Sequence, residues 1–186
     1  EYVALLAAAA KAARTADPNV VILSAPLAIN LETPELAGNM SDLDYLERLY
    51  AAGGGQWFDV LSVNAFGMDR PPDDAPSPGV LNFRRVELQR AIMSRYGDGG
   101  KPVWTAEFGW NAAPPSAAEQ HWRSVPETSQ AQWTVDAVRW ADARWPWAGV
   151  FNVWYFRHCC QTSDRAVYYF RMVDVDWTTR RIYDAV

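Results

Sequence analysis

Four short runs of β-forming residues recur along the chain at intervals of about forty residues, and a helical segment precedes each of them. The runs occupy residues 20–25 (VVILSA), 59–66 (DVLSVNAF), 102–110 (PVWTAEFGW) and 149–156 (GVFNVWYF). Strands that alternate with helices in this way are typical of βαβ units, whose strands lie parallel in one sheet. We therefore predict an α/β fold with a parallel sheet.

Boundary signals support the helices between these runs. Ser41 and Asp44 have the spacing of a capping box, and the glycines at 53–55 end the apolar helical pattern that follows. Pro146 separates the last predicted helix from the next run. We predict helices over residues 2–15, from 41 to the glycines at 53–55, over 82–96 and over 128–144.

The longest polar and Pro-rich loops follow the predicted strands, whereas the connections that lead into strands are shorter. DRPPDDAPSPG follows the second run, and a still longer segment follows the third. In parallel α/β folds, ligands bind at the C-terminal ends of the strands, where such loops gather. No internal repeat or linker divides the chain, so we treat residues 1–186 as one domain.

The composition excludes several classes of protein. Apolar residues make up 49% and charged residues 21%, which is ordinary for a globular domain. The net charge of -5, with scattered Lys and Arg, argues against nucleic acid as a partner. No apolar run is long enough to span a membrane, and the N-terminus lacks signal-peptide features. Localisation stays undetermined, with an extracellular or cell-envelope location favoured.

The cysteine and tryptophan content gives two further expectations. Cys159 and Cys160 are adjacent, which disfavours a disulfide between them, and with His121 and His158 they form no paired metal-ligand spacing. We predict no metal and no cofactor. The 10 Trp residues exceed the needs of a core of this size, and flat aromatic faces suit sugar rings, although most of these side chains will pack helices onto the sheet.

Glu107 is the side chain that most strongly indicates chemistry. Period-two alternation in the third run puts Val103, Thr105 and Glu107 on one face, so the carboxylate lies where the strand ends. Phe108 and Gly109 follow it, and the glycine lets a ligand approach closely. A purely structural glutamate is more often found on a helix or in a surface ion pair. We predict that Glu107 points into a ligand pocket.

Residues 104–110 resemble the clan A glycoside hydrolases, whose seventh barrel strand typically ends in a Trp-x-x-Glu-Phe-Gly-Trp pattern that carries the nucleophile. The runs at 20–27, 59–67 and 149–156 are similar to strands five, six and eight of that family, and the tail from 169 to 185 is similar to its closing segment. The resemblance implies a (β/α)8 barrel, of which this chain supplies about the last four βα units, with the N-terminal half absent.

The resemblance also implies a retaining mechanism with Glu107 as the nucleophile and a second carboxyl as acid and base. In the family that second carboxyl follows an Asn at the end of strand four, which corresponds to sequence upstream of Glu1. No Asn-Glu pair occurs in the chain. The segment by itself would then be inactive on its poly- or oligosaccharide substrate.

The sixth-strand region departs from the family, which often has His-x-Tyr where this chain has Asn64-Ala65-Phe66. The family's Tyr hydroxyl bonds to the nucleophile, and Phe66 cannot donate such a bond. Either another group orients Glu107, or the site is altered or inactive. Asn64 can bond a sugar hydroxyl or satisfy loop backbone, and both alternatives stay open.

Aromatic side chains supply the other predicted substrate contacts. Trp154 matches the family's sugar-stacking platform, and a core role is its competing interpretation. Trp110 adjoins the loop after the third run and is predicted to contact substrate, together with Asn64 and Phe66. His121 and Trp122 lie in the same loop as further candidates for lining a cleft.

Two alternatives to the glycosidase remain. One is a non-catalytic carbohydrate-binding or scaffold module on a degenerate barrel, which the departure at 64–66 favours. The other is a doubly wound nucleotide-binding protein, which the absence of a glycine-rich phosphate motif after any strand disfavours. Half a barrel leaves strand edges uncovered, so we also predict self-association through those edges.

Overall fold

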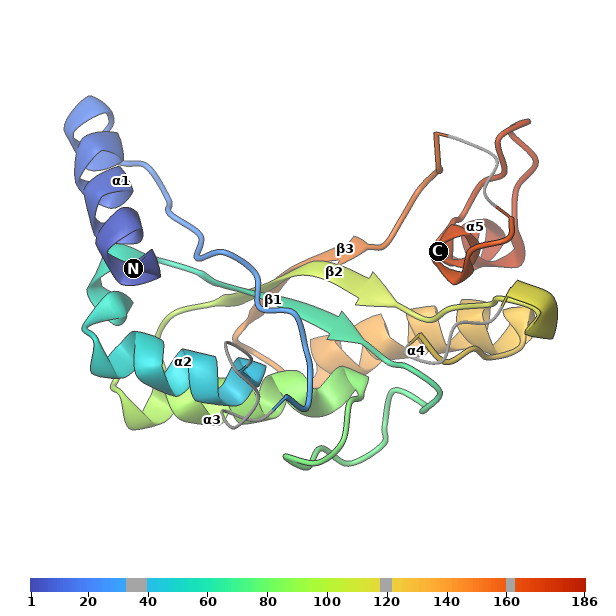
Figure 1. Cartoon of the computed structure of the whole chain (residues 1–186), viewed down its shortest axis with the longest axis horizontal. Coiled ribbons are helices and arrows are strands. Elements are labelled where there is room, and N and C mark those ends of the chain that lie inside the picture. The colour runs from blue at the N-terminus through green and yellow to red at the C-terminus, as the bar shows by residue number, and fades with distance from the viewer. Residues whose placement is uncertain (33–39, 118–121, 160–162) are drawn as a thin grey trace.

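The computed structural model describes residues 1–32, 40–117, 122–159 and 163–186. In that part of the chain, three parallel strands form one sheet in the order β1 (Leu61–Phe66), β2 (Val103–Gly109) and β3 (Ala148–Val153). Helices lie along one face of the sheet, and the two terminal regions rise at its ends, so the ribbon is concave (Figure 1). The predicted α/β fold with a parallel sheet is confirmed.

Five helices accompany the sheet in the described residues. They are α1 (Tyr2–Ala16), α2 (Asp42–Ala51), α3 (Val86–Arg95), α4 (Glu127–Arg144) and α5 (Arg181–Ala185). The helices predicted from sequence are confirmed as α1 to α4. Ser41 caps α2 as predicted, because its hydroxyl accepts a hydrogen bond from the backbone N–H of Asp44 at 3.1 Å. A 3₁₀ turn (Phe83–Arg85) leads into α3.

The first predicted strand is present only as irregular pairing beside β1. Leu23 and Leu27 form isolated parallel bridges to Val60 and Val63, and no continuous ladder joins them. Two local features interrupt the ladder. The hydroxyl of Ser24 accepts the hydrogen bond from the N–H of Ser62 at 3.0 Å in place of a backbone carbonyl, and residue 26 is a proline without an N–H. The prediction of a regular strand over residues 20–25 is therefore wrong.

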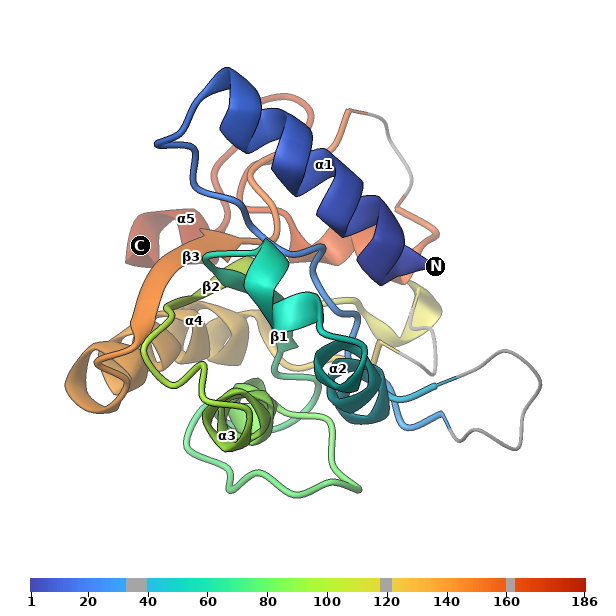
Figure 2. The same ribbon diagram turned by 90° about the vertical axis from the view of Figure 1, so that its left-hand side faces the viewer.

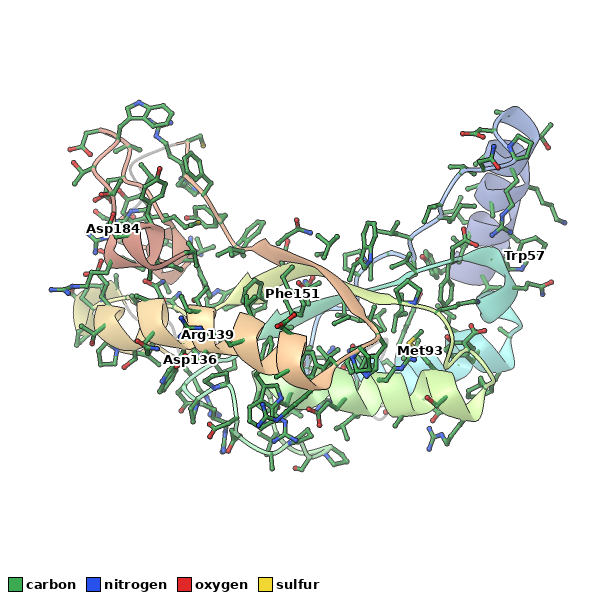
Figure 3. All side chains as sticks on the ribbon, turned by 180° about the vertical axis from the view of Figure 1, so that it is seen from behind. Trp57, Met93, Asp136, Arg139, Phe151 and Asp184 are labelled. Carbon is green, nitrogen blue, oxygen red and sulfur yellow. The ribbon has the colours of Figure 1, made fainter. Side chains whose placement is uncertain are left out.

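The hydrophobic core lies between the sheet and α2, α3 and α4, which form an arc on one side of the strands when the sheet is seen from its end (Figure 2). Met93 of α3 and Phe151 of β3 belong to this layer, whereas Asp136 and Arg139 lie on the outer side of α4 (Figure 3). Each large apolar side chain fully buried there stabilises the fold by roughly 1.5–3 kcal/mol. We call this side of the sheet the helix face.

The opposite side of the sheet, which we call the inward face, is much less covered. Val150 of β3 is 39% exposed, and Leu23 and Val21 of the neighbouring segment are 39% and 57% exposed. In a closed barrel the inward-facing residues of eight strands fill the interior, and here the described strands leave that interior open. The chain is thus an open, partial (β/α) barrel.

None of the helices in residues 1–32, 40–117, 122–159 and 163–186 has both the length and the apolar character needed to cross a membrane.

Candidate functional site

Glu107 lies near the C-terminal end of β2, on the inward face. Val103 and Phe108 both pack in the core on the helix face although five positions separate them, which strict alternation forbids. The register explains this, because Val63 and Asn64 of β1 are adjacent but pair with Thr105 and Glu107, so that β2 contains a bulge. The prediction that Glu107 shares a face with Val103 is wrong. The bulge turns the carboxylate away from the helices.

The side chain of Asn64 contacts Glu107 directly. The two residues are partners in the register of β1 and β2, and Asn64 Nδ2 donates a hydrogen bond to Glu107 Oε2 at 3.1 Å. Asn64 Oδ1 is buried and has no hydrogen-bond partner in the described part of the chain. The amide nitrogen of Asn64 therefore binds the carboxylate, and its amide oxygen makes no hydrogen bond within the described residues.

Burial governs the ionisation of Glu107. Desolvation raises the pKa of the Glu107 carboxyl above its usual value, and no charged neighbour among the described residues contributes to the shift. A second carboxylate at close range would also have raised the pKa through repulsion, and a cation would have lowered it. No charged side chain of the described residues therefore shifts the pKa of Glu107.

An aromatic cluster lies just beyond the C-terminal ends of the strands. Phe66 packs edge-on against Trp122 and Phe170, with ring centroids 5.3 and 5.4 Å apart, and Trp154 packs on the same group while remaining partly accessible. Phe66 pairs with Gly109, two residues beyond Glu107. The predicted positions 66 and 154 therefore lie together, beside the strand position two residues beyond Glu107, and Phe66 is only 5% exposed. The Trp154–Tyr155 peptide bond is cis.

Trp110 lies in a different place from the one we predicted. Its ring is fully buried on the helix face against Phe83 and Trp133, and its indole N–H donates to the carbonyl of Arg70 at 2.8 Å. Gly67 makes room for it, because a Cβ there would lie 1.9 Å from the indole ring. The expected substrate contact of Trp110 is therefore not met, since this position gives the ring no exposed surface. His121 lies outside the described residues.

Two buried side-chain amides that we did not predict hold the loop after β2. Gln130 Nε2 at the start of α4 donates to the carbonyls of Trp110 and Tyr169 at 2.7 and 2.9 Å. Asn111 Nδ2 donates to the carbonyl of Ala166 at 2.8 Å. These bonds tie the loop to the C-terminal segment that carries Phe170. Their partners are distant in sequence, so no local pattern could have identified them.

A buried ion pair fixes the loop after β1. Arg85 and Asp42 are 1% and 0% exposed at their side chains, and their nearest charged atoms are 2.9 Å apart. Arg85 also donates to the carbonyls of Pro78 and Val80 at 2.9 and 3.0 Å. The guanidinium thus joins α2, α3 and the loop in one place. This anchoring fixes the loop against α2 and the start of α3.

Comparisons with known proteins support the fold. No protein-family model and no curated protein sequence matches the chain. Among solved structures, it is similar to a family 39 glycoside hydrolase from Bacteroides cellulosilyticus WH2, with 16% identity and a TM-score of 0.65 over 98% of this chain and 36% of that one. It is also similar to an exo-β-agarase, with 14% identity and a TM-score of 0.60 over 99% of this chain and 21% of that one.

A third similar structure is a GH2 β-galacturonidase from Eisenbergiella tayi bound to glycerol, with 15% identity and a TM-score of 0.55. The match covers 95% of this chain and 28% of that one. The chain thus spans between 21% and 36% of the length of these three enzymes. At such identities the likeness concerns the fold, and the chain has the fold of part of the barrel of glycoside hydrolases, as its sequence motifs predicted.

Proposed function

We propose that this chain is the nucleophile-bearing part of a retaining glycoside hydrolase, with Glu107 as the nucleophile. The observation that carries the proposal is the setting of Glu107 at the C-terminal end of a parallel strand, turned by a bulge onto the inward face and held by Asn64. Ligand sites of parallel barrels lie at that end of the strands. The glycosidase-like fold supports the same reading.

The proposed reaction needs two carboxyl groups. The Glu107 carboxylate attacks the anomeric carbon and forms a glycosyl ester, while an acid gives its proton to the departing oxygen. The same acid, now a base, then removes a proton from the water that hydrolyses the ester. We assign the acid/base role to none of the described residues, because none of their charges shifts the pKa of Glu107.

The substrate contacts follow from the positions around Glu107. Trp154 is partly accessible beside the aromatic cluster and would supply a stacking face for the sugar ring. Asn64 contributes through Glu107, because its Nδ2 donates to the carboxylate and its Oδ1 is buried in the described chain. Phe66 packs with Trp154 in the same cluster and is only 5% exposed, so it supports the platform. The substrate class is a poly- or oligosaccharide.

The proposal is tested by trapping the ester in the longest form of the protein that its gene encodes. After incubation with activated 2-fluoro-glycosides, intact-mass analysis and peptide mapping should locate a sugar on Glu107. Glu107→Gln should remove the adduct, while Glu47→Gln on α2 serves as a matched control that keeps it. A folded protein that binds oligosaccharides but forms no adduct would instead favour a non-catalytic binding module on the same fold.

A further inference from the structure

We propose that Asn64 is the positioning residue for Glu107. The catalytic meaning of this inference rests on the proposed function. The contact itself is a property of the chain, because Asn64 Nδ2 lies 3.1 Å from Glu107 Oε2. It can therefore be tested whether or not the protein cleaves a sugar.

An ionised Glu107 fixes the orientation of the Asn64 amide. An ionised carboxylate is purely an acceptor, so the amide must present its NH₂ group to Glu107 and turn its oxygen away. The unpartnered, buried Oδ1 agrees with this arrangement. Because the bulge in β2 makes Glu107 the register partner of Asn64, a side chain as short as asparagine spans the gap between the strands.

The strands around Glu107 offer few other groups that could change its pKa. β1 (LSVNAF), β3 (AGVFNV) and residues 22–27 (ILSAPL) contain no ionisable side chain, and Glu107 is the one such group in β2 (VWTAEFG). Burial disfavours the carboxylate, and a hydrogen bond to its charged form favours it. By its hydrogen bond, Asn64 should therefore oppose the effect of burial.

The test is a ¹³C NMR titration of the Glu107 side-chain carboxyl in the folded protein, with the signal assigned by its loss in Glu107→Gln. In Asn64→Ala the pKa of Glu107 should rise by about one unit, the size expected for losing a hydrogen bond to a charged group. Asn152→Ala is the matched control. Its amide donates to the backbone carbonyl of Thr105 at 2.9 Å, so the pKa of Glu107 should stay unchanged.

Asn64→Asp keeps the volume of the side chain and covers the case in which the alanine variant does not fold. Two carboxyl groups would then face each other, and the pair should titrate in two steps with the upper pKa above that of wild-type Glu107. A Glu107 pKa unchanged in either folded variant overturns the inference. Failure of the 2-fluoro-glycoside labelling bears only on the proposed function.

If the protein is active, the pH profile gives a second readout. The acidic limb of kcat/KM should move to higher pH in Asn64→Ala by the same amount as the titration, because the nucleophile must be ionised. A merely structural loss would lower the rate at every pH and leave the limb in place, which would contradict a positioning role.

Discussion

The two faces of the same three strands differ sharply in composition and burial. On the helix face, Leu61, Val63 and Phe108 are all 0% exposed and pack on α2 and α3. On the inward face, Asn64 and Glu107 bond to each other, and Val150 is 39% exposed. The helix face is closed to water, and the inward face carries the ionisable side chain of Glu107. Neighbouring residues of one strand therefore serve the fold and the site separately.

The helix face supplies the stability of the fold, and the inward face carries the candidate site. Apolar burial on the helix face supplies most of the driving force for folding, because it removes the largest area from water. The inward face carries a partly desolvated carboxylate, which costs stability instead of adding to it. Changes on the two faces should thus have effects of different size and sign.

The largest expected effect comes from truncating the helix face. Phe108 packs edge-on against Phe151, with ring centroids 5.5 Å apart, and Phe108→Ala should lower the free energy of unfolding by about 3–5 kcal/mol because it leaves a cavity. Urea denaturation measures the loss. Phe156→Ala, at a site 51% exposed, is the control and should cost about 0.5 kcal/mol or less. Equal losses would remove the distinction between core and exposed sites.

The buried ion pair between Asp42 and Arg85 should rank second. Asp42→Asn leaves the guanidinium without its counterion in a site where both side chains are almost fully buried, and we expect a loss of about 3 kcal/mol. Glu47→Gln breaks a pair with Arg95 in which the side chains are 35% and 62% exposed, and it should cost less than about 1 kcal/mol. Urea unfolding of both variants checks the ranking, and a reversed order would refute the anchoring role of Arg85.

A smaller effect of opposite sign is expected at Glu107. Burial raises its folded-state pKa above the unfolded value, so the group contributes stability fully below the unfolded pKa and loses that contribution as pH rises through the folded pKa. Glu107→Gln should therefore be more stable than the wild type at pH 7, with the advantage shrinking at pH 4. Thermal unfolding at both pH values checks this. A destabilised variant at pH 7 would mean that the carboxylate supports the fold.

The smallest effect on unfolding is expected at Val150 of β3, the edge strand of the described sheet. We propose that the open inward face and this edge drive self-association of the chain. Val150→Lys should then lower the mass seen by size-exclusion chromatography with light scattering, because a lysine opposes edge pairing. Its effect on the free energy of unfolding should stay within about 0.5 kcal/mol. A wild-type chain that is monomeric at every concentration would exclude the proposal.

Much of the fold could be predicted because its signals are local. The helical periodicity and the Ser41 cap placed α2, and apolar runs placed β1 to β3. The strand over residues 20–25 could not be judged in this way, because its ladder depends on the Ser24 hydroxyl contacting Ser62 across the sheet. Among the predicted site residues, the structure places Asn64 beside Glu107 and Phe66 beside Trp154, and it buries Trp110 in the core.

The order of strands and helices, and the place of one carboxylate at the end of a strand, can be predicted from the sequence. This is possible because caps, turns and periodicity act within a few residues. The tertiary structure alone decided that a bulge turns Glu107 away from Val103, that Asn64 binds it, and that Trp110 enters the core. Those outcomes depend on which neighbour a strand pairs with and how much space that neighbour leaves, as Gly67 does beneath the Trp110 ring.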